Sequence, residues 1–337
     1  MIPHNKPTLD SSEELAASEV IRSGWLAQGT HVEAFENEFC DFLGLPQGHA
    51  VAVSSGTSAL YFALSALGAK KKTVSFPAYV CAALRNAVGM NQSIEELIDN
   101  EANSANVSID QLNQSASDFA IVPHTYGIPV EIEKISNKVI IEDCCQAIGA
   151  KLGGKPVGTI ATVGIYSFYA TKLMTSGGQG GMIVSKDKAV IDELFDIREF
   201  DQRNDSKLRF NFQMTDIQAA IGRVQLKKLP GFLQRRQEIF NAYKQAGFNL
   251  FDVNDNNRAP VRYRAILRTN RAQQISAALL EKKIKTIIPL EDWELLGDRQ
   301  DFLNAYEFTQ TSLSLPIYPS LTDVDVNYII DCVQNCL

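Results

Sequence analysis

The amino-acid sequence predicts an α/β protein with a large, mostly parallel sheet between helices, followed by a smaller α+β part. Up to Gly231, short apolar runs alternate with helix-like segments, which is the pattern of strands joined by covering helices. These runs are apolar along their whole length, as expected for strands buried on both faces. The pattern changes after Pro230-Gly231, and a chain of 337 residues is long enough for two domains.

The first part of the chain contains seven apolar runs that we interpret as the strands of one sheet. They occupy residues 49–54, 73–76, 94–98, 119–123, 139–142, 163–168 and 182–185. Helices are expected over residues 58–67, 79–88, 188–200 and 215–229, with Thr215 as an N-cap of the last one.

We divide the chain into a large domain over residues 1–231 and a small α+β domain over residues 232–337. The small domain is expected to begin with a long helical stretch that leads into residues 262–267 (RYRAIL), followed by a helix near 271–282 and a final helix at 323–336. Residues 252–258 are expected to form a polar surface loop. Residues 1–12 are expected to pack on it.

Charge and composition exclude several functional classes. The net charge of −7 disfavours a nucleic-acid binder, and an anionic substrate would require positive charge to gather locally. The N-terminus has no leader-like layout and no apolar run approaches the ~20 residues of a membrane span, so we expect a cytoplasmic protein. The six cysteines and four histidines show no metal-ligand spacing, and we expect no metal.

Ser55, Gly56 and Thr57 follow the first strand and begin a helix. A helix N-terminus offers unpaired N–H groups and partial positive charge to a phosphate, and Gly56 permits a close approach. The alternative is ordinary helix capping by serine and threonine.

Asp143 and Lys172 each follow a buried strand, where ligands of open α/β sheets gather. A carboxylate there needs a cation or strong donors, although Asp143 could simply cap a helix. A semi-buried lysine is a nucleophile for Schiff-base chemistry, whereas a lone lysine is usually on the surface. Together, a phosphate-binding turn, a carboxylate and a lysine meet the three demands of pyridoxal phosphate (PLP).

The sequence also resembles the DegT/DnrJ/EryC1/StrS sugar aminotransferases, which have the fold-type-I architecture of PLP-dependent enzymes. The resemblance spans most of the chain and is strongest in three segments, Ile141-Glu142-Asp143-Cys144-Cys145-Gln146-Ala147, Ser167-Phe168 leading to Lys172, and Asn211 with Met214-Thr215-Asp216-Ile217-Gln218-Ala219-Ala220. Lys172, rather than the histidine of dehydratase relatives, argues for a transaminase.

The resemblance implies a role for each matching residue. Lys172 would bond to the cofactor and shuttle a proton, Asp143 would pair with the pyridine nitrogen, and Gln146 would donate to the phenolic oxygen. Gly56, Thr57 and Ser167 would hold the phosphate, together with Ser55. Asn211 would reach the phosphate of a second subunit, so a homodimer with shared sites is expected. Cys81 stands where many relatives have a stacking aromatic residue, and Tyr79 could replace it.

The expected reaction moves an amino group from an amino acid, normally glutamate, to a keto-sugar, normally nucleotide-linked, with the cofactor alternating between PLP and pyridoxamine phosphate (PMP). This role requires the pKa of Lys172 to move towards neutrality. Two alternatives remain at this point: transamination of a non-nucleotide ketone such as a cyclitol, and a non-catalytic binding or regulatory relative.

Overall fold

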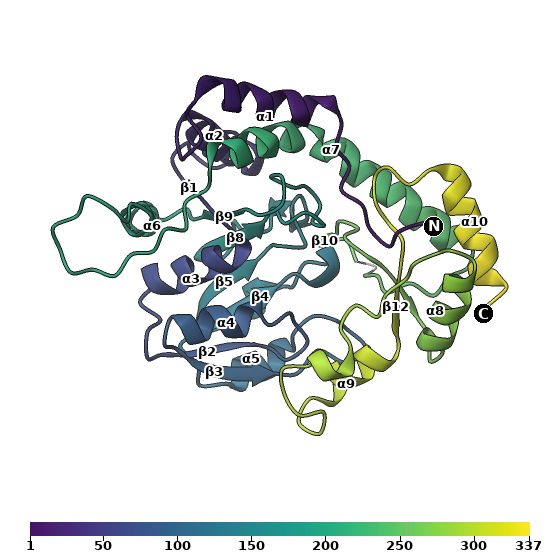
Figure 1. Ribbon diagram of the computed structural model, residues 1–337. Helices are drawn as coiled ribbons and strands as arrows, with labels where there is room; N and C mark the ends of the chain where they lie inside the picture. Colours follow the sequence, from purple (N-terminus) through teal and green to yellow (C-terminus); the bar gives the residue numbers. More distant parts are fainter. Residues whose placement is uncertain (254) are drawn as a thin grey trace.

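Seven strands form one central sheet in the N-terminal part of the chain (Figure 1). The computed structural model describes residues 1–253 and 255–337; Asn254, in the loop expected at 252–258, lies outside the described residues. The strand order is β1-β9-β8-β5-β4-β2-β3, and β9 alone in this sheet runs antiparallel to its neighbours. The strands are β1 (Ala50–Val53), β2 (Thr73–Pro77), β3 (Ile94–Ile98), β4 (Phe119–Pro123), β5 (Val139–Asp143), β8 (Val163–Ser167) and β9 (Gly181–Val184).

The predicted mostly parallel sheet of seven strands is therefore confirmed, and each strand lies within two residues of its expected bounds. A separate three-stranded sheet, β10-β6-β7, was not expected. Its strands β6 (Lys151–Leu152), β7 (Lys155–Pro156) and β10 (Arg258–Ala259) have two residues each, too few to show a period in the sequence.

Helices cover both faces of the central sheet, and neighbouring strand residues alternate between the two cores. In β1, Val51 and Val53 face the core under the first group of helices, whereas Ala50 and Ala52 face the other core. The first group is α3 (Gly56–Ala66), α4 (Ala83–Met90) and α6 (Lys188–Arg198). The second face is covered by α2 (Thr30–Leu43) and the first half of α7 (Asp216–Gln245), with α1 (Ser11–Ser23) packed on α7. The short α5 (Ile109–Gln114), η1 (Thr125–Gly127) and η2 (Ile132–Lys134) lie in the connections.

The helix expected over 215–229 is wrong at its C-terminal end, because α7 continues through Pro230 to Gln245. Its start agrees with the sequence, since Thr215 caps the helix and exchanges capping-box hydrogen bonds with Gln218. A proline inside a helix removes one hydrogen bond. Here the buried side chains of the second half, including Phe240 and Tyr243, outweigh that loss. Figure 1 shows α7 running from the central sheet to the C-terminal part.

The C-terminal part is built on the antiparallel pair β11 (Ala265–Arg268) and β12 (Ser312–Leu315). The second half of α7 shares a core there with α8 (Ala272–Glu281) and α10 (Asp323–Gln334), while η3 (Asp292–Glu294) and α9 (Leu303–Gln310) precede β12. The N-terminal segment also lies here, since Ile2 bridges Ile284 and His4 hydrogen-bonds Ser314 at 2.8 Å. Both termini are on this side of the molecule (Figure 1).

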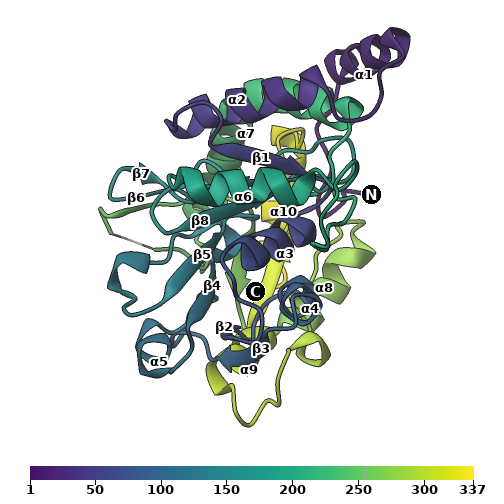
Figure 2. The ribbon, with the colours of Figure 1, turned by 90° about the vertical axis from the view of Figure 1, so that its left-hand side faces the viewer.

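A buried ion pair fastens α6 to the opposite layer near β1, where Figure 2 shows α6 crossing in front. Arg198, the last residue of α6, donates to the carboxylate of Glu36 from α2, which also accepts from the Ala52 N–H at 2.7 Å. Burial raises the pKa of Glu36, and the charge of Arg198 opposes that rise.

We expect the Arg198→Met variant to lose about 3–5 kcal/mol of unfolding free energy near pH 8, because it leaves a carboxylate buried without its cation. Burial raises the pKa of Glu36 and Arg198 opposes that rise, so in the folded variant this pKa lies further above its usual 4.5 than in the wild type. The variant therefore loses more stability than the wild type as the pH rises, and its deficit should be larger near pH 8 than near about pH 5. Urea unfolding followed by circular dichroism at both pH values measures this.

Arg203→Met is the matched control, since its guanidinium lies 3.6 Å from Asp196 near the surface. It should cost less than about 1 kcal/mol. Equal losses in the two variants would contradict the role assigned to the buried pair.

Candidate active site

One cavity of about 360 Å³ lies where the carboxyl ends of β1, β4, β5 and β8 meet the C-terminal part. The parallel arrangement brings these strand ends to the same edge of the sheet. Eight of the nine residues expected in a cofactor site line this cavity: Ser55, Gly56, Thr57, Tyr79, Asp143, Gln146, Ser167 and Lys172. The ninth, Asn211, is exposed and is not among the lining residues.

The N-terminus of α3 supplies unpaired backbone donors to the cavity. Ser55 caps the helix by accepting from the Ser58 N–H, and the Ser58 hydroxyl accepts from the Ser55 N–H in return. Within the described residues, no acceptor is recorded for the N–H groups of Gly56 and Thr57. A Cβ at position 56 would lie only 2.9 Å from that of Ser167, so glycine allows the N-terminus of α3 to approach the end of β8 closely.

Lys172 lies on the cavity wall, with its Nζ 5.4 Å from the centroid of the Tyr263 ring. Burial lowers the pKa of its amine, but the neighbouring Tyr263, Cys145, Asp143 and Cys81 together raise it above the usual value. The expected shift towards neutrality is therefore wrong for this structure. The acidic groups gathered around the amine favour its charged form.

Asp143 and Gln146 are held by backbone hydrogen bonds that leave part of each side chain free. One carboxylate oxygen of Asp143 accepts from the Cys145 N–H at 2.9 Å. The Gln146 carbonyl oxygen accepts from the Tyr126 N–H at 2.8 Å, which assigns the amide orientation and leaves the NH₂ group as a donor. The cavity wall thus offers one acceptor and one donor side by side.

Tyr79 and Cys81 occupy the wall beside them. The Tyr79 ring is buried edge-on against Phe308 and Tyr126, and its hydroxyl lies 2.6 Å from that of Tyr126. Cys81 is exposed to the cavity, where a larger side chain would reduce the free volume. The stacking role of Tyr79 stays a prediction.

Several lining residues were not identified from the sequence, above all Tyr263 and Arg264. They directly precede β11 and enter the site from the C-terminal part. The segment RYRAIL was singled out in the sequence, but a short run of residues does not indicate which distant part of the chain it will face. The alternating arginines in an otherwise apolar run were the available signal.

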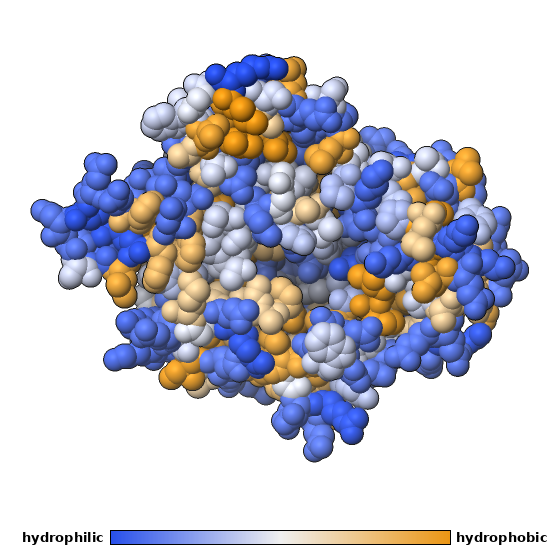
Figure 3. Space-filling model, viewed as in Figure 1, coloured by the Kyte–Doolittle hydropathy of each residue, from blue (hydrophilic) through white to orange (hydrophobic). Residues whose placement is uncertain are grey.

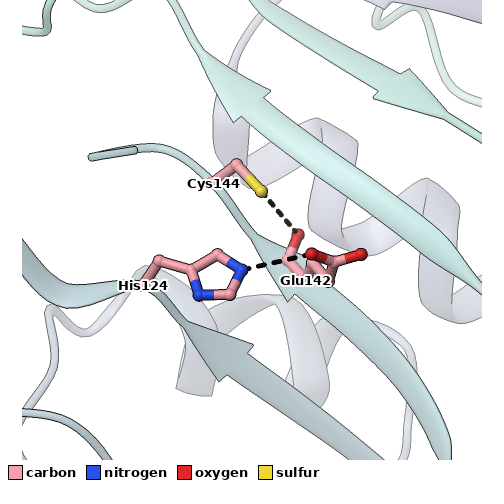
Figure 4. Close-up of side chains that lie close together, drawn as sticks. All are labelled: His124, Glu142 and Cys144. Carbon is pink, nitrogen blue, oxygen red and sulfur yellow. Dashed lines mark hydrogen bonds and ion pairs between the residues drawn. The ribbon is translucent and has the colours of Figure 1, made fainter. Parts of the chain in front are cut away.

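Three buried side chains, His124, Glu142 and Cys144, lie close enough to suggest a metal site (Figure 4). Their hydrogen bonds favour a different interpretation. The Glu142 carboxylate accepts from His124 Nε2 at 3.2 Å and from the N–H groups of Gly158, Ile160 and Ala161 at 2.6–2.8 Å. His124 Nδ1 accepts from the Val130 N–H, so Nε2 carries the ring proton. Donors therefore already occupy the lone pairs a metal would use.

Comparison with known proteins identifies the family. The sequence profile of the DegT/DnrJ/EryC1/StrS aminotransferase family matches residues 7–334. The chain belongs to this family. It is 32% identical over 257 residues to GDP-perosamine synthase of Caulobacter vibrioides, covering 71% of this chain and 68% of the relative. Identity to the GDP-perosamine synthase of Vibrio cholerae is 26% over 375 residues, covering 99% of each.

The crystal structure of the aminotransferase TlmJ from Streptoalloteichus hindustanus superposes with a TM-score of 0.92 at 25% identity, covering 99% of this chain and 98% of that one. The expected family and fold-type-I architecture are confirmed, and the chain is a PLP-dependent aminotransferase. The unpaired donors at Gly56 and Thr57, the carboxylate of Asp143 and the amine of Lys172 fit that cofactor.

We expect Glu142→Gln to lower the free energy of unfolding by about 2–4 kcal/mol, because the new NH₂ group would face N–H donors that now meet an oxygen. Thermal or urea unfolding measures the loss. Glu133→Gln is the control, since Glu133 forms an exposed pair with Lys155 at 3.1 Å. If the two variants lost the same free energy of unfolding, the hydrogen bonds accepted by Glu142 would not stabilise the protein as described above.

Proposed function

We propose that this aminotransferase transfers an amino group from an amino acid, L-glutamate, to a nucleotide-linked keto-sugar, as a step in amino-sugar biosynthesis. The observation that carries the proposal is the single cavity shared by Lys172, Asp143, Gln146 and the N-terminus of α3. The names of the relatives support the substrate class, because GDP-perosamine is a nucleotide-linked amino sugar.

When bound, PLP supplies an electron sink that stabilises the negative charge left on a substrate carbon after its proton is removed. The N–H groups of Gly56 and Thr57, with the hydroxyls of Ser55, Thr57 and Ser167, would bind its phosphate. The Asp143 carboxylate would hold a proton on the pyridine nitrogen, which would keep the ring electron-poor.

Gln146 would donate its free NH₂ to the phenolic oxygen of PLP, and its hydrogen bond from the Tyr126 N–H fixes that donor. Tyr79 would support the pyridine ring of the cofactor. Lys172 would remove and return the proton at the substrate α carbon, a transfer that needs an uncharged amine. The neighbours of Lys172 raise the pKa of its amine, so the amine has to lose a proton before it can accept one from the substrate.

We further propose a homodimer in the cytoplasm, in which Asn211 contacts the phosphate bound by the second subunit. Asn211 lies in the extended segment between α6 and α7, which projects from the molecule (Figure 1). Leu208 in the same segment is 74% exposed, and Leu15, Ile21 and Trp25 in or next to α1 are also exposed. Hydrophobic residues gather over these upper helices (Figure 3), as they do on association surfaces.

No helix in residues 1–253 and 255–337 has the length and apolar character needed to cross a bilayer.

We expect Lys172→Ala to reduce glutamate-dependent amino transfer by at least about 100-fold, because the proton-moving amine is lost. The purified wild-type protein should show the visible absorbance of bound PLP and lose it on adding glutamate. The variant should show an altered spectrum and no such response. Lys186→Ala, in the exposed connection between β9 and α6, is the matched control. A colourless wild-type protein that ignores added PLP and glutamate would refute the proposed function.

Mixing two inactive variants tests the shared site. Asn211→Asp places a carboxylate against the partner's bound phosphate and should be inactive by itself. In a mixed dimer with Lys172→Ala, one site contains both defects and the other contains neither. After subunit exchange, we expect about a quarter of wild-type activity, because half of the dimers are mixed and each has one intact site. If the mixture stays inactive although exchange is demonstrated, Asn211 does not act across an interface.

A further inference from the structure

We propose that Arg264 binds the α-carboxylate of the amino donor. This inference rests on the proposed function and adds to it the residue that recognises the donor.

Arg264 and Lys172 lie against the same aromatic ring. The guanidinium carbon of Arg264 is 5.2 Å from the centroid of Tyr263, and Lys172 Nζ is 5.4 Å from it. Both residues line the cavity. The amine that acts on the donor and a planar cation able to bind a carboxylate through two hydrogen bonds therefore line the same cavity, each within 5.4 Å of the centre of the Tyr263 ring.

The charge of Arg264 has no carboxylate partner among the described residues. No Asp or Glu oxygen lies within 4.0 Å of its guanidinium, and its buried Nε has no hydrogen-bond acceptor. Its recorded contact is from Nη1 to His4 Nε2 at 3.3 Å, and the guanidinium also lies 5.9 Å from the Tyr126 ring centroid. A partly buried cation without an anion is costly to keep, which points to a ligand that supplies one.

His4 orients Arg264 without neutralising it. Burial, followed by the charges of Arg264, Arg236 and Lys285, lowers the pKa of His4 to about 3. The imidazole is therefore neutral at ordinary pH, and its Nε2 lies 3.3 Å from Arg264 Nη1 and 2.8 Å from the Ser314 hydroxyl, which share its one lone pair when both donate to it. An aspartate in its place would have cancelled the positive charge that the cavity presents.

The other three arginines in this region have their own partners outside the cavity. Arg262 pairs with Asp252 at 2.6 Å, and Arg236 donates to three backbone carbonyls. Arg268 donates to the Ser312 hydroxyl at 3.0 Å, lies over the Phe308 ring and does not line the cavity. Arg264 alone of these four faces the cavity.

The position of Arg264 favours a carboxylate on the reacting carbon over the other anions of the reaction. The cofactor phosphate has its own donors at the N-terminus of α3, which come from a different element of the wall. The phosphates of a nucleotide-linked sugar are separated from a ring ketone by several bonds. In an α-amino acid, by contrast, the carboxylate is attached to the carbon whose proton Lys172 removes. A cation that shares the Tyr263 ring and the cavity with Lys172 is therefore better placed for the α-carboxylate than for the other two anions.

The test uses the full-length holoenzyme and the variants Arg264→Gln and Arg264→Lys, with Arg268→Gln as the control that removes a charge from the same segment. L-Glutamate is titrated while the visible absorbance is followed, so that the donor half of the reaction is read without an acceptor. We expect Arg264→Gln to raise the half-maximal glutamate concentration about 10- to 100-fold, since a charge-assisted hydrogen bond is lost. Arg264→Lys should fall between Arg264→Gln and wild type, and Arg268→Gln should match wild type.

Calorimetry gives a readout independent of turnover. Arg264→Gln should lose affinity for 2-oxoglutarate by a similar factor while its affinities for GDP and UDP stay within about twofold of wild type. A loss of nucleotide affinity with 2-oxoglutarate binding intact would overturn the inference, since Arg264 would then serve the sugar nucleotide. An unchanged glutamate response in Arg264→Gln would overturn it as well.

A wild-type measurement keeps the inference testable if the glutamine variant does not fold. 4-Aminobutyrate has the amine and the distal carboxylate of glutamate but no α-carboxylate. It should require at least about 10-fold higher concentrations than glutamate to change the spectrum, and an equal response would overturn the inference. A wild-type protein that responds to no amino donor refutes the proposed function instead, so the two failures are distinguishable.

Discussion

The active site depends on one constraint, the meeting of parallel strand ends at a single edge of the sheet. β1, β4, β5 and β8 run in the same direction, and the residues that follow them necessarily come together there. Ser55, His124, Asp143 and Ser167 are far apart in sequence but share this edge. The hydrogen bonds of the ladder fix their spacing before any side chain contributes, so the chemistry is positioned by backbone geometry.

The two adjacent carboxylates at the end of β5 have different roles, because one stabilises the structure and the other faces the cavity. Side chains of neighbouring strand residues point to opposite faces, so Glu142 and Asp143 enter different environments. Glu142 meets three backbone N–H groups and His124, which use its acceptor capacity and fasten the 158–161 loop to β5. Asp143 accepts from the Cys145 N–H and keeps acceptor capacity facing the cavity. The buried Glu142 therefore stabilises the wall on which Asp143 can act.

The sequence predicted the parts of the protein whose signal is local. Each central strand is a short apolar run, and Thr215 with Gln218 gives a readable helix start. The end of α7 was mispredicted because proline is a local signal, whereas the burial of Phe240 and Tyr243 that overrides it is tertiary. The turn at residues 55–57, Asp143 and Lys172 could be predicted as one group because each directly follows a strand that is recognisable in the sequence. Tyr263 and Arg264 were not, since their approach to the site depends on how the C-terminal part packs against the sheet edge.

Positive charges in the cavity allow a protein with a negative net charge to bind anionic ligands. The chain carries a net charge of −7, yet its cavity wall contains Lys172 and Arg264 against the single carboxylate of Asp143. Burial strengthens the field of these groups because little water screens them. The neutral His4 preserves the imbalance, since a charged acidic partner at that position would have removed it. Phosphate and carboxylate groups are then attracted to this cavity, where the two cations outnumber the single carboxylate.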